Sequence, residues 1–168
     1  MVGVRKKILM LVGNFGVGKS TLINNKILDR VDDIFLQISK RWWVLGANIG
    51  GADSLSKFNK SEVIKKIEKA RLEGIIITGN YYCSNKDVDI LRRNNDVSIV
   101  YLNTSFENNA KRIGQRGGII NPNTYNAKLK LHANLMRNNK HKVKIKILDN
   151  NRGAIAVKKD FEKILNDL

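Results

Sequence analysis

The chain has 168 residues, of which 42% are hydrophobic and 27% are charged. This composition is typical of one globular domain, so we expect a single domain over residues 1–168 and exclude a chain that is disordered throughout. Lys and Arg outnumber Asp and Glu by 31 to 15, which gives a net charge of +16 and favours a polyanionic partner such as nucleic acid. AT-rich codons, which enrich Lys and Asn, would produce the same excess without such a partner.

Cysteine content and hydropathy indicate the compartment. The single Cys83 excludes an internal disulfide and favours a reducing compartment, so we expect a cytoplasmic protein. The apolar run within Met1 to Val12 is short and is followed by a glycine-rich segment instead of a cleavage site, so we expect a buried strand and no signal peptide. No apolar stretch approaches the roughly 20 residues of a membrane span.

Continuous apolar runs predict the strands of a parallel sheet that is covered on both faces. In chain order they lie at residues 7–12, 34–38, 75–79, 97–102 and 143–148. Residues 40–45 are ambiguous, because the adjacent Trp42 and Trp43 would face opposite sides of a strand.

Helical spacing of apolar residues predicts helices between these strands. In chain order they cover residues 20–30, 59–73, 86–94, 105–116, 124–139 and 154–168. We expect Ser61 to cap the second helix and Gly74 to end it, and residues 46–56, with three Gly, to form a loop. The alternation predicts an α/β fold, a P-loop kinase-like parallel sheet sandwiched by helices in a single domain.

Residues 13–20 match the pattern G-x-x-x-x-G-K-[ST] in full and lie between a predicted strand and a predicted helix. In this motif backbone N–H groups surround the phosphates of ATP or GTP, Lys19 contacts the β and γ phosphates, and Ser20 binds Mg²⁺. The predicted nucleotide-binding residues are Gly13, Asn14, Phe15, Gly16, Val17, Gly18, Lys19, Ser20 and Thr21.

The acidic residue that usually follows a neighbouring strand and holds Mg²⁺ is missing. The strand at 75–79 leads into Thr78-Gly79-Asn80, and the strand at 97–102 is followed by Asn103-Thr104. This favours a kinase over a motor or a hydrolytic switch, and it directs the search for a carboxylate to the loops. Asp53, after Gly50 and Gly51, is the candidate base for the acceptor hydroxyl; capping of a helix that begins near Ser54 is the alternative, and both roles can coexist.

Arg112 and Arg116 are candidate catalytic residues. They lie four residues apart on the predicted helix 105–116, so they share a face, and Gly117-Gly118 frees the chain after them. Small kinases place arginines of this kind over the transferring phosphoryl group. A solvated basic face is the alternative, since Lys111 lies alongside.

Aromatic residues near the two candidate loops can stack on a nucleobase. Trp43, Tyr81 and Tyr82, together with Gly50 and Gly51, are the candidate substrate-binding residues, and packing in the core is the alternative for each aromatic ring.

Two histidines and one lysine-rich segment match no specific functional motif. His132 and His141 show no metal-ligand spacing, so surface or packing roles are expected. Residues 142–146 alternate Lys with apolar residues, which predicts a strand with one basic face, either solvated or in contact with nucleic acid.

Four features together resemble the phage P-loop kinases that phosphorylate 5-hydroxymethyluracil in DNA, within the nucleoside and nucleotide kinase superfamily. They are the glycine loop at 13–20, Gly50-Gly51-Ala52-Asp53, the strand that leads into Thr78-Gly79-Asn80-Tyr81, and the pair Arg112 and Arg116. The resemblance spans roughly residues 7–117. The group is expected to have Gly-Gly-Cys-Asp and an acidic residue after the middle strand, where this chain has Ala52 and Thr78-Gly79.

The resemblance implies Mg²⁺-dependent transfer of the γ-phosphoryl group of ATP to the hydroxyl of a hydroxymethylated pyrimidine in DNA, in the cytoplasm of an infected bacterium. The partner would then be DNA carrying a modified pyrimidine. Two other functions remain open. One is a kinase for a free nucleoside or nucleotide, which would not need so basic a surface; the other is a nucleotide-binding, DNA-binding module without transferase activity.

Overall fold

The computed structural model describes residues 5–14, 17–23, 29–31, 34–46 and 54–168. Its strands are β1 (Lys6–Gly13), β2 (Asp29–Val31), β3 (Phe35–Gln37), β4 (Trp42–Leu45), β5 (Gly74–Thr78), β6 (Asn95–Asn103) and β7 (Lys144–Asp149). Its helices are α1 (Lys19–Ile23), α2 (Lys60–Lys69), α3 (Asn85–Leu91), α4 (Phe106–Gln115), α5 (Pro122–Asn139) and α6 (Ala154–Asp167), with a 3-10 turn η2 (Asn150–Arg152).

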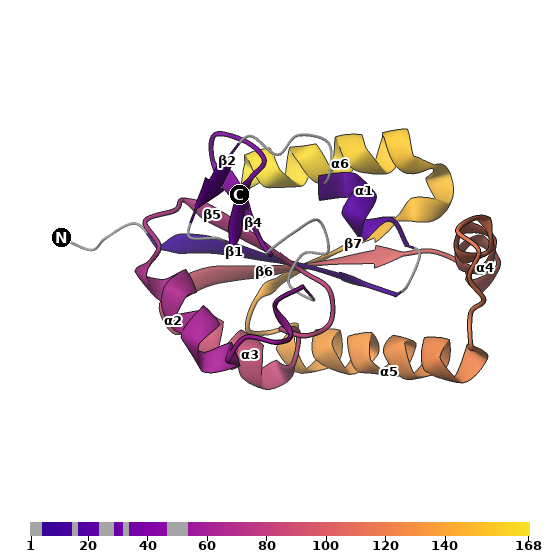
Figure 1. Ribbon diagram of the computed structural model, residues 1–168, viewed down its shortest axis with the longest axis horizontal. Coiled ribbons are helices and arrows are strands. Elements are labelled where there is room, and N and C mark those ends of the chain that lie inside the picture. Colours follow the sequence, from indigo (N-terminus) through magenta and orange to yellow (C-terminus); the bar gives the residue numbers. More distant parts are fainter. Residues whose placement is uncertain (1–4, 15–16, 24–28, 32–33, 47–53) are drawn as a thin grey trace.

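The described strands form one seven-stranded sheet in the order β2-β3-β4-β5-β1-β6-β7. All pairs from β4 to β7 are parallel, whereas β2 with β3 and β3 with β4 are antiparallel. Helices α1 and α6 cover one face, and α2, α3 and α5 cover the other (Figure 1). This arrangement confirms the α/β sheet between helices that the sequence predicts. None of the described helices has the length and apolar character needed to cross a membrane.

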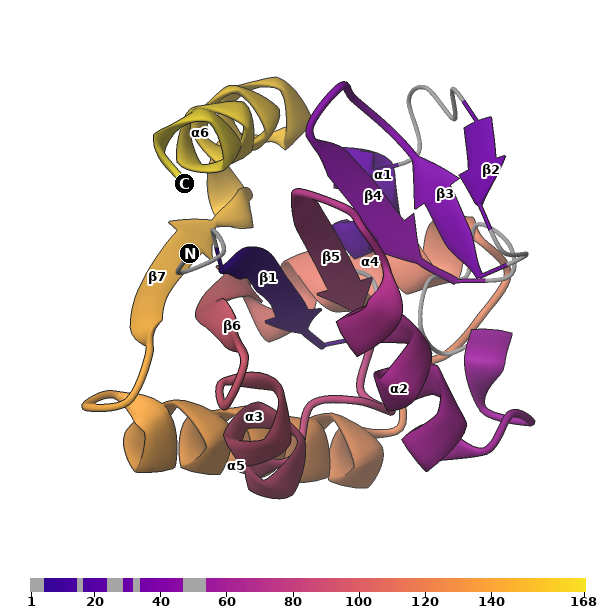
Figure 2. The same cartoon turned by 90° about the vertical axis from the view of Figure 1, so that its left-hand side faces the viewer.

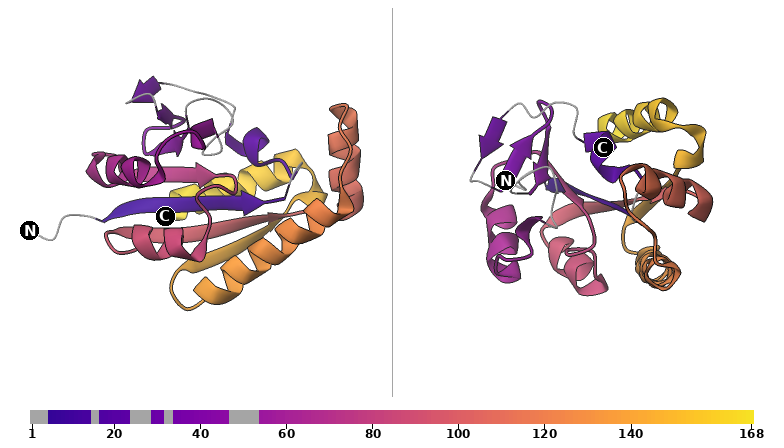
Figure 3. Two further views of the ribbon diagram at one scale, coloured as in Figure 1. Left: turned by 60° about the horizontal axis from the view of Figure 1, so that its bottom comes forward. Right: turned by 45° about the vertical axis from the view of Figure 1, so that its right-hand side comes forward.

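The central strand β1 is buried on both faces, as its continuous apolar run predicts. Ile8, Met10 and Val12 pack into the core under α2, α3 and α5, while Leu9 and Leu11 pack into the core under α1 and α6. Successive side chains of a strand point to opposite faces, so one apolar segment supplies both cores. Because the pairs from β4 to β7 are parallel, the carboxyl ends of these strands meet at one end of the sheet, where α4 lies (Figure 3).

The two adjacent tryptophans of β4 settle the ambiguity at residues 40–45. Trp42 lies in the core under α1 and α6, and Trp43 packs against the core on the opposite face. Opposite placement is what a strand covered on both faces requires, so the segment is a strand.

Two predicted helix boundaries are wrong. The helix predicted for residues 20–30 is described only as Lys19–Ile23, and Asp29–Val31 forms β2, because antiparallel pairing with β3 outweighs the helical spacing. The helix predicted for residues 59–73 ends at Lys69, where Ala70 is extended.

Capping at both ends explains the bounds of α2. Asn59, and not Ser61, is its N-cap: the Asn59 side chain accepts a hydrogen bond from the Ser61 backbone N–H at 3.0 Å. At the other end, Lys6 donates to the carbonyl oxygens of Ile67 and Glu68, which satisfies two of the last carbonyls of the helix. Gly74 therefore begins β5 and does not end the helix.

Gly74 is predicted to tolerate no side chain. A Cβ atom there would lie 2.6 Å from Cε3 of the buried Trp42 ring, whereas a Cβ at Gly114, within α4, would meet nothing within 4 Å. Gly74→Ala should lower the free energy of unfolding by about 1 to 3 kcal/mol through overpacking. Gly114→Ala should raise it by about 0.5 to 1 kcal/mol. Urea unfolding curves measure both changes, and equal effects of the two substitutions would contradict the packing described for Trp42.

Candidate nucleotide-binding site

The segment after β1 turns tightly against β6. A Cβ atom at Gly13 would lie 2.7 Å from the carbonyl oxygen of Leu102 and 2.8 Å from Cγ2 of Val17, so only glycine fits. Gly18 has a φ of +96°, which side chains rarely adopt. Both glycines of the motif thus have a physical reason in the described structure. Phe15 and Gly16, between them, lie outside the described residues.

Lys19 lies in the first turn of α1 and turns back over the loop. Its Nζ donates to the carbonyl oxygens of Gly13 at 2.6 Å and Asn14 at 2.9 Å. The ammonium group is therefore held within the loop, where a phosphate would be bound. Ser20 and Thr21 follow in the same turn and are exposed, as their expected contacts with Mg²⁺ and nucleotide require.

A brace from two other elements holds the loop at Val17. The Val17 carbonyl accepts a hydrogen bond from Nδ2 of Asn150 and another from Arg112, whose N–H lies 3.3 Å away. Arg112 also donates to the Asn150 carbonyl at 2.9 Å. Asn150 is 4% exposed, and its Nδ2 would lie 2.8 Å from a Cβ placed on Gly18. Residues from α4 and η2 therefore fix the far half of the glycine loop.

Sequence reasoning missed Asn150. Only its position two residues after the strand predicted at 143–148 signalled that it would lie at the carboxyl end of the sheet, where the glycine loop is. Its neighbour Asn151 has a related role, because the Asn151 Oδ1 accepts hydrogen bonds from Thr104 Oγ1, the Ser105 N–H and Asn108 Nδ2 at 2.8, 3.0 and 2.8 Å. These bonds fasten the amino end of α4 to η2.

Arg112 and Arg116 do lie together beside the glycine loop. Both line a small cavity of about 90 Å³. Its other lining residues are Gly18, Thr21, Leu22, Asn150 and Ala154. Arg116 is exposed at the carboxyl end of α4, and Gly117 after it has a φ of +78°. The two arginines therefore differ in surroundings. Arg112 forms a hydrogen bond to the glycine loop at Val17, whereas Arg116 is exposed at the rim of the cavity.

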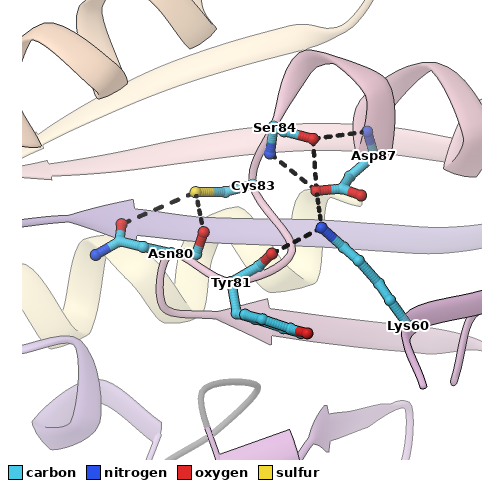
Figure 4. A network of polar contacts seen from close by, with 6 residues as sticks. All are labelled: Lys60, Asn80, Tyr81, Cys83, Ser84 and Asp87. Atoms are coloured by element: carbon cyan, nitrogen blue, oxygen red, sulfur yellow. Dashed lines mark hydrogen bonds and ion pairs between the residues drawn. The ribbon is translucent and has the colours of Figure 1, made fainter. Parts of the chain in front are cut away.

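A polar network shapes the loop between β5 and α3 (Figure 4). Lys60 of α2 donates to the Tyr81 carbonyl and to Oδ2 of Asp87, both at 2.9 Å. Asp87 also accepts hydrogen bonds from the backbone and side chain of Ser84, in a capping box at the start of α3. At 3% exposed, Asp87 serves structure and does not replace the missing strand-end carboxylate.

The described residues offer little to a resident metal ion. Among them, no group of three or more His, Cys, Asp or Glu could hold one, and the candidate Asp53 lies outside the described residues, as do Gly50 and Gly51. Mg²⁺ usually keeps several waters and is bound mainly by substrate phosphates. The exposed Ser20 hydroxyl therefore fits a cation that arrives with the nucleotide.

The three candidate aromatic residues have different surroundings. Tyr82 is 1% exposed, and burial, followed by the nearby Tyr81 and Asp87, raises the pKa of its hydroxyl to about 12. Trp43 packs against the core. Tyr81 is 37% exposed, and its ring stacks edge-on against Tyr82 at 4.9 Å between centroids. Of the three, Tyr81 has the ring surface that a base could contact.

His132 connects helix α5 to the loop after β5. It is 0% exposed, and its Nε2 lies 2.7 Å from Oδ1 of Asn80. Its Nδ1 is buried without a hydrogen-bond partner, so the tautomer that donates from Nε2 is favoured, because it leaves no N–H unpaired. Burial, and then the positive charges of Lys19 and Lys128, lower the pKa of His132 to about 4. The packing role expected for this residue agrees with its burial.

No known protein family matches the sequence, and no curated protein matches it. The fold does have relatives among solved structures. A sugar kinase from Janibacter superposes with a TM-score of 0.57 at 12% identity, over 97% of this chain and 95% of that chain. A deoxyadenosine kinase from M. mycoides with bound dCTP gives 0.52 at 15% identity, over 96% and 100%. A gluconokinase from Sinorhizobium meliloti gives 0.50 at 14% identity, over 96% of each.

At these identities the likeness concerns the fold. It confirms the α/β, P-loop kinase-like architecture that the sequence predicts. It does not identify the acceptor, because the three relatives carry the names of different kinases.

The buried His132 predicts a loss of stability in mild acid. Its pKa is lowered from 6.5 in the unfolded chain to about 4 in the folded protein. The unfolded state therefore binds more protons between these values, and the free energy of unfolding should fall by on the order of 3 kcal/mol as the pH drops through this window. Urea unfolding from pH 7 to pH 4 measures the change. His132→Gln should remove this component, whereas His141→Gln, at an exposed position, should retain it; an identical pH profile in both variants would contradict the assignment.

Proposed function

We propose that this protein is an ATP-dependent kinase that phosphorylates a hydroxyl group of a nucleoside unit, with 5-hydroxymethyluracil in DNA as the acceptor. The observation that carries the proposal is the full glycine motif of residues 13–20, whose described part joins β1 to α1 of a P-loop kinase-like fold and whose Lys19 donates to the carbonyl oxygens of Gly13 and Asn14. This loop supplies a site for the phosphates of ATP at the carboxyl end of the sheet.

In the proposed reaction, the acceptor oxygen forms a bond to the γ phosphorus while the bond from that phosphorus to the β–γ bridging oxygen breaks, and ADP leaves. Lys19 would neutralise charge on the β and γ phosphates, and Ser20 would contribute a ligand to the Mg²⁺ that accompanies ATP. The acceptor proton would pass to Asp53, the proposed base.

The two arginines would divide the work at the phosphates. Arg112 already donates to the Val17 and Asn150 carbonyls, so it would keep the glycine loop in its binding shape. Arg116, which is exposed and lines the same cavity, would contact the transferring group. Both were expected to act directly; the contacts of Arg112 favour a positioning role.

Two observations bear on the acceptor. The charge of +16 supports a polymer such as DNA. A free nucleoside is the second candidate, supported by the similarity to a deoxyadenosine kinase over 96% of this chain. An assay with labelled ATP and three acceptors, namely DNA containing hydroxymethyluracil, plain DNA and free nucleosides, separates them. Label in modified DNA alone supports the proposal, label in nucleosides alone supports the second candidate, and binding without any transfer supports a nucleotide-binding module without transferase activity.

Lys19→Ala is expected to abolish transfer, because the Lys19 ammonium is the charge that the motif places on the β and γ phosphates. Loss of such a preorganised contact lowers turnover by roughly a hundredfold or more. Lys130→Ala removes the same charge from an exposed position on α5 and should keep normal activity. Label transfer under identical conditions measures both variants, and normal turnover of Lys19→Ala would refute the nucleotide site.

Asp53→Asn distinguishes a base from a helix cap. A base contributes typically a hundred- to ten-thousand-fold, so turnover should fall by that order while the affinities for ATP and DNA stay nearly unchanged. A cap accepts Asn about as well as Asp. Steady-state kinetics with separate binding measurements give the answer: full activity would indicate the cap, and joint loss of nucleotide binding and turnover would indicate Mg²⁺ ligation.

A further inference from the structure

A basic cavity opens at the end of the sheet opposite the glycine loop. Its volume is about 650 Å³, and the amino ends of β1, β6 and β7 form its floor. Figure 2 looks onto this end of the molecule, with β7, β1 and β6 toward the viewer. Six Lys and Arg side chains line this amino-end cavity: Arg5, Lys7, Arg92, Lys140, Lys142 and Lys144. Its acidic lining residues are Asp96 and Asp167.

The cavity gathers charges that are far apart in the sequence. Parallel pairing places the start of β1 beside the starts of β6 and β7, which brings residues near positions 5, 92 and 140 together. The sequence pattern alone indicated only the alternating lysines at 142–146. The fold therefore concentrates part of the excess positive charge in one concave place.

Several of these cations are held in defined positions. Arg5 donates to the carbonyl oxygens of Arg92, Arg93 and Asn95 and forms an ion pair with Asp96 at 3.3 Å. Asp89 pairs with both Arg92 and Lys142 at 3.1 Å. Neutralisation is partial, because the six basic side chains of the lining are balanced by only three carboxylates, those of Asp96 and Asp167 in the lining and of the neighbouring Asp89. The rim is thus ordered and keeps a net positive charge.

The lining favours the backbone of a duplex over other anions. Among the described residues that line the cavity none is Phe, Tyr or Trp, and His141 supplies the one ring, whereas single-stranded nucleic acid is usually held by stacking on several aromatic side chains. Five of the basic residues are exposed and come from different strand ends and turns, namely Arg5, Arg92, Lys140, Lys142 and Lys144. Dispersed, exposed cations suit a row of phosphates, which releases counterions as it binds.

We propose that the amino-end cavity binds the phosphate backbone of duplex DNA at a site separate from the glycine loop. β6 has nine residues, so at about 3.3 Å per residue the two ends of the sheet lie roughly 26 Å apart. That separation, roughly eight base pairs of duplex at 3.4 Å per pair, keeps the cavity distinct from the glycine loop. The cavity holds part of the polymer away from the glycine loop and keeps the protein on DNA.

DNA binding at the amino-end cavity does not depend on catalysis. Any increase in the rate of DNA phosphorylation that this binding produces rests on the proposed function. Binding is therefore measured without ATP, by fluorescence anisotropy of a labelled duplex of mixed sequence between 50 and 200 mM salt. The test variant is Lys7→Ala/Lys140→Ala/Lys144→Ala. The control variant, Lys65→Ala/Lys66→Ala/Lys69→Ala, removes the same charge from exposed positions on α2. Thermal unfolding verifies that both are folded.

The test variant should bind at least tenfold more weakly at 50 mM salt. The slope of log K against log salt should become shallower by about 2.7, since each lost phosphate contact contributes roughly 0.9. The control should change the slope by less than one. Equal losses in both variants would show that the charge acts diffusely and would overturn the proposal, as would tighter binding of single strands than of duplex, or displacement of the duplex by micromolar tripolyphosphate.

The kinase assay reports separately on the proposed function. If the test variant binds DNA more weakly but phosphorylates hydroxymethyluracil DNA at the wild-type rate once that DNA is saturating, the cavity is an anchor and the enzyme activity stands on its own. If the wild-type protein binds the duplex through the cavity but transfers no phosphoryl group, the surface is supported and the kinase proposal fails.

Discussion

The arrangement of the candidate site depends on one backbone carbonyl, that of Val17. It accepts hydrogen bonds from Asn150 of η2 and Arg112 of α4, so a single oxygen joins the glycine loop to two elements that follow it by more than ninety residues in sequence. A charged donor strengthens such a bond, and an unpaired buried carbonyl would be costly. The shape of the loop, the position of η2 and the direction of α4 are therefore coupled. The Asn151 contacts at the start of α4 reinforce the same junction.

Helix α5 supports the other side of the site. Asn14, at the end of β1, donates to the Tyr125 carbonyl at 3.0 Å, and His132 contacts Asn80 after β5. One helix thus touches the loops that follow two neighbouring strands. Because buried polar groups must be satisfied, these contacts fix α5 at a defined position along the sheet. Edge-on packing of Phe106 on Tyr125, at 4.9 Å between ring centroids, connects α5 to α4 as well.

Much of the fold could be predicted from the sequence, because buried parallel strands and the glycine loop have strong local patterns. The two helix boundaries that were wrong depend on contacts with distant residues: β2 exists through its pairing with β3, and the carboxyl end of α2 is capped by Lys6. Asn150 was missed for the same reason, since nothing near it in sequence shows that it reaches Val17. The arginine pair was found because its spacing on one helix is local, but only the structure distinguishes the bonded Arg112 from the exposed Arg116.

The strand β1 contributes a residue to a proposed binding site at each of its ends: Lys7 lines the amino-end cavity, and Gly13 begins the glycine loop. Between them lie residues that are 0 or 1% exposed, so the strand is an apolar spacer between two polar edges. Screening by salt and water weakens electrostatic coupling over such a separation. A lineage could therefore gain or lose affinity for a polymer through substitutions at one edge while the chemistry at the other edge is preserved. Parallel α/β sheets in general allow separate functions at the amino and carboxyl ends of their strands, because the two ends belong to the same strands but have different side chains.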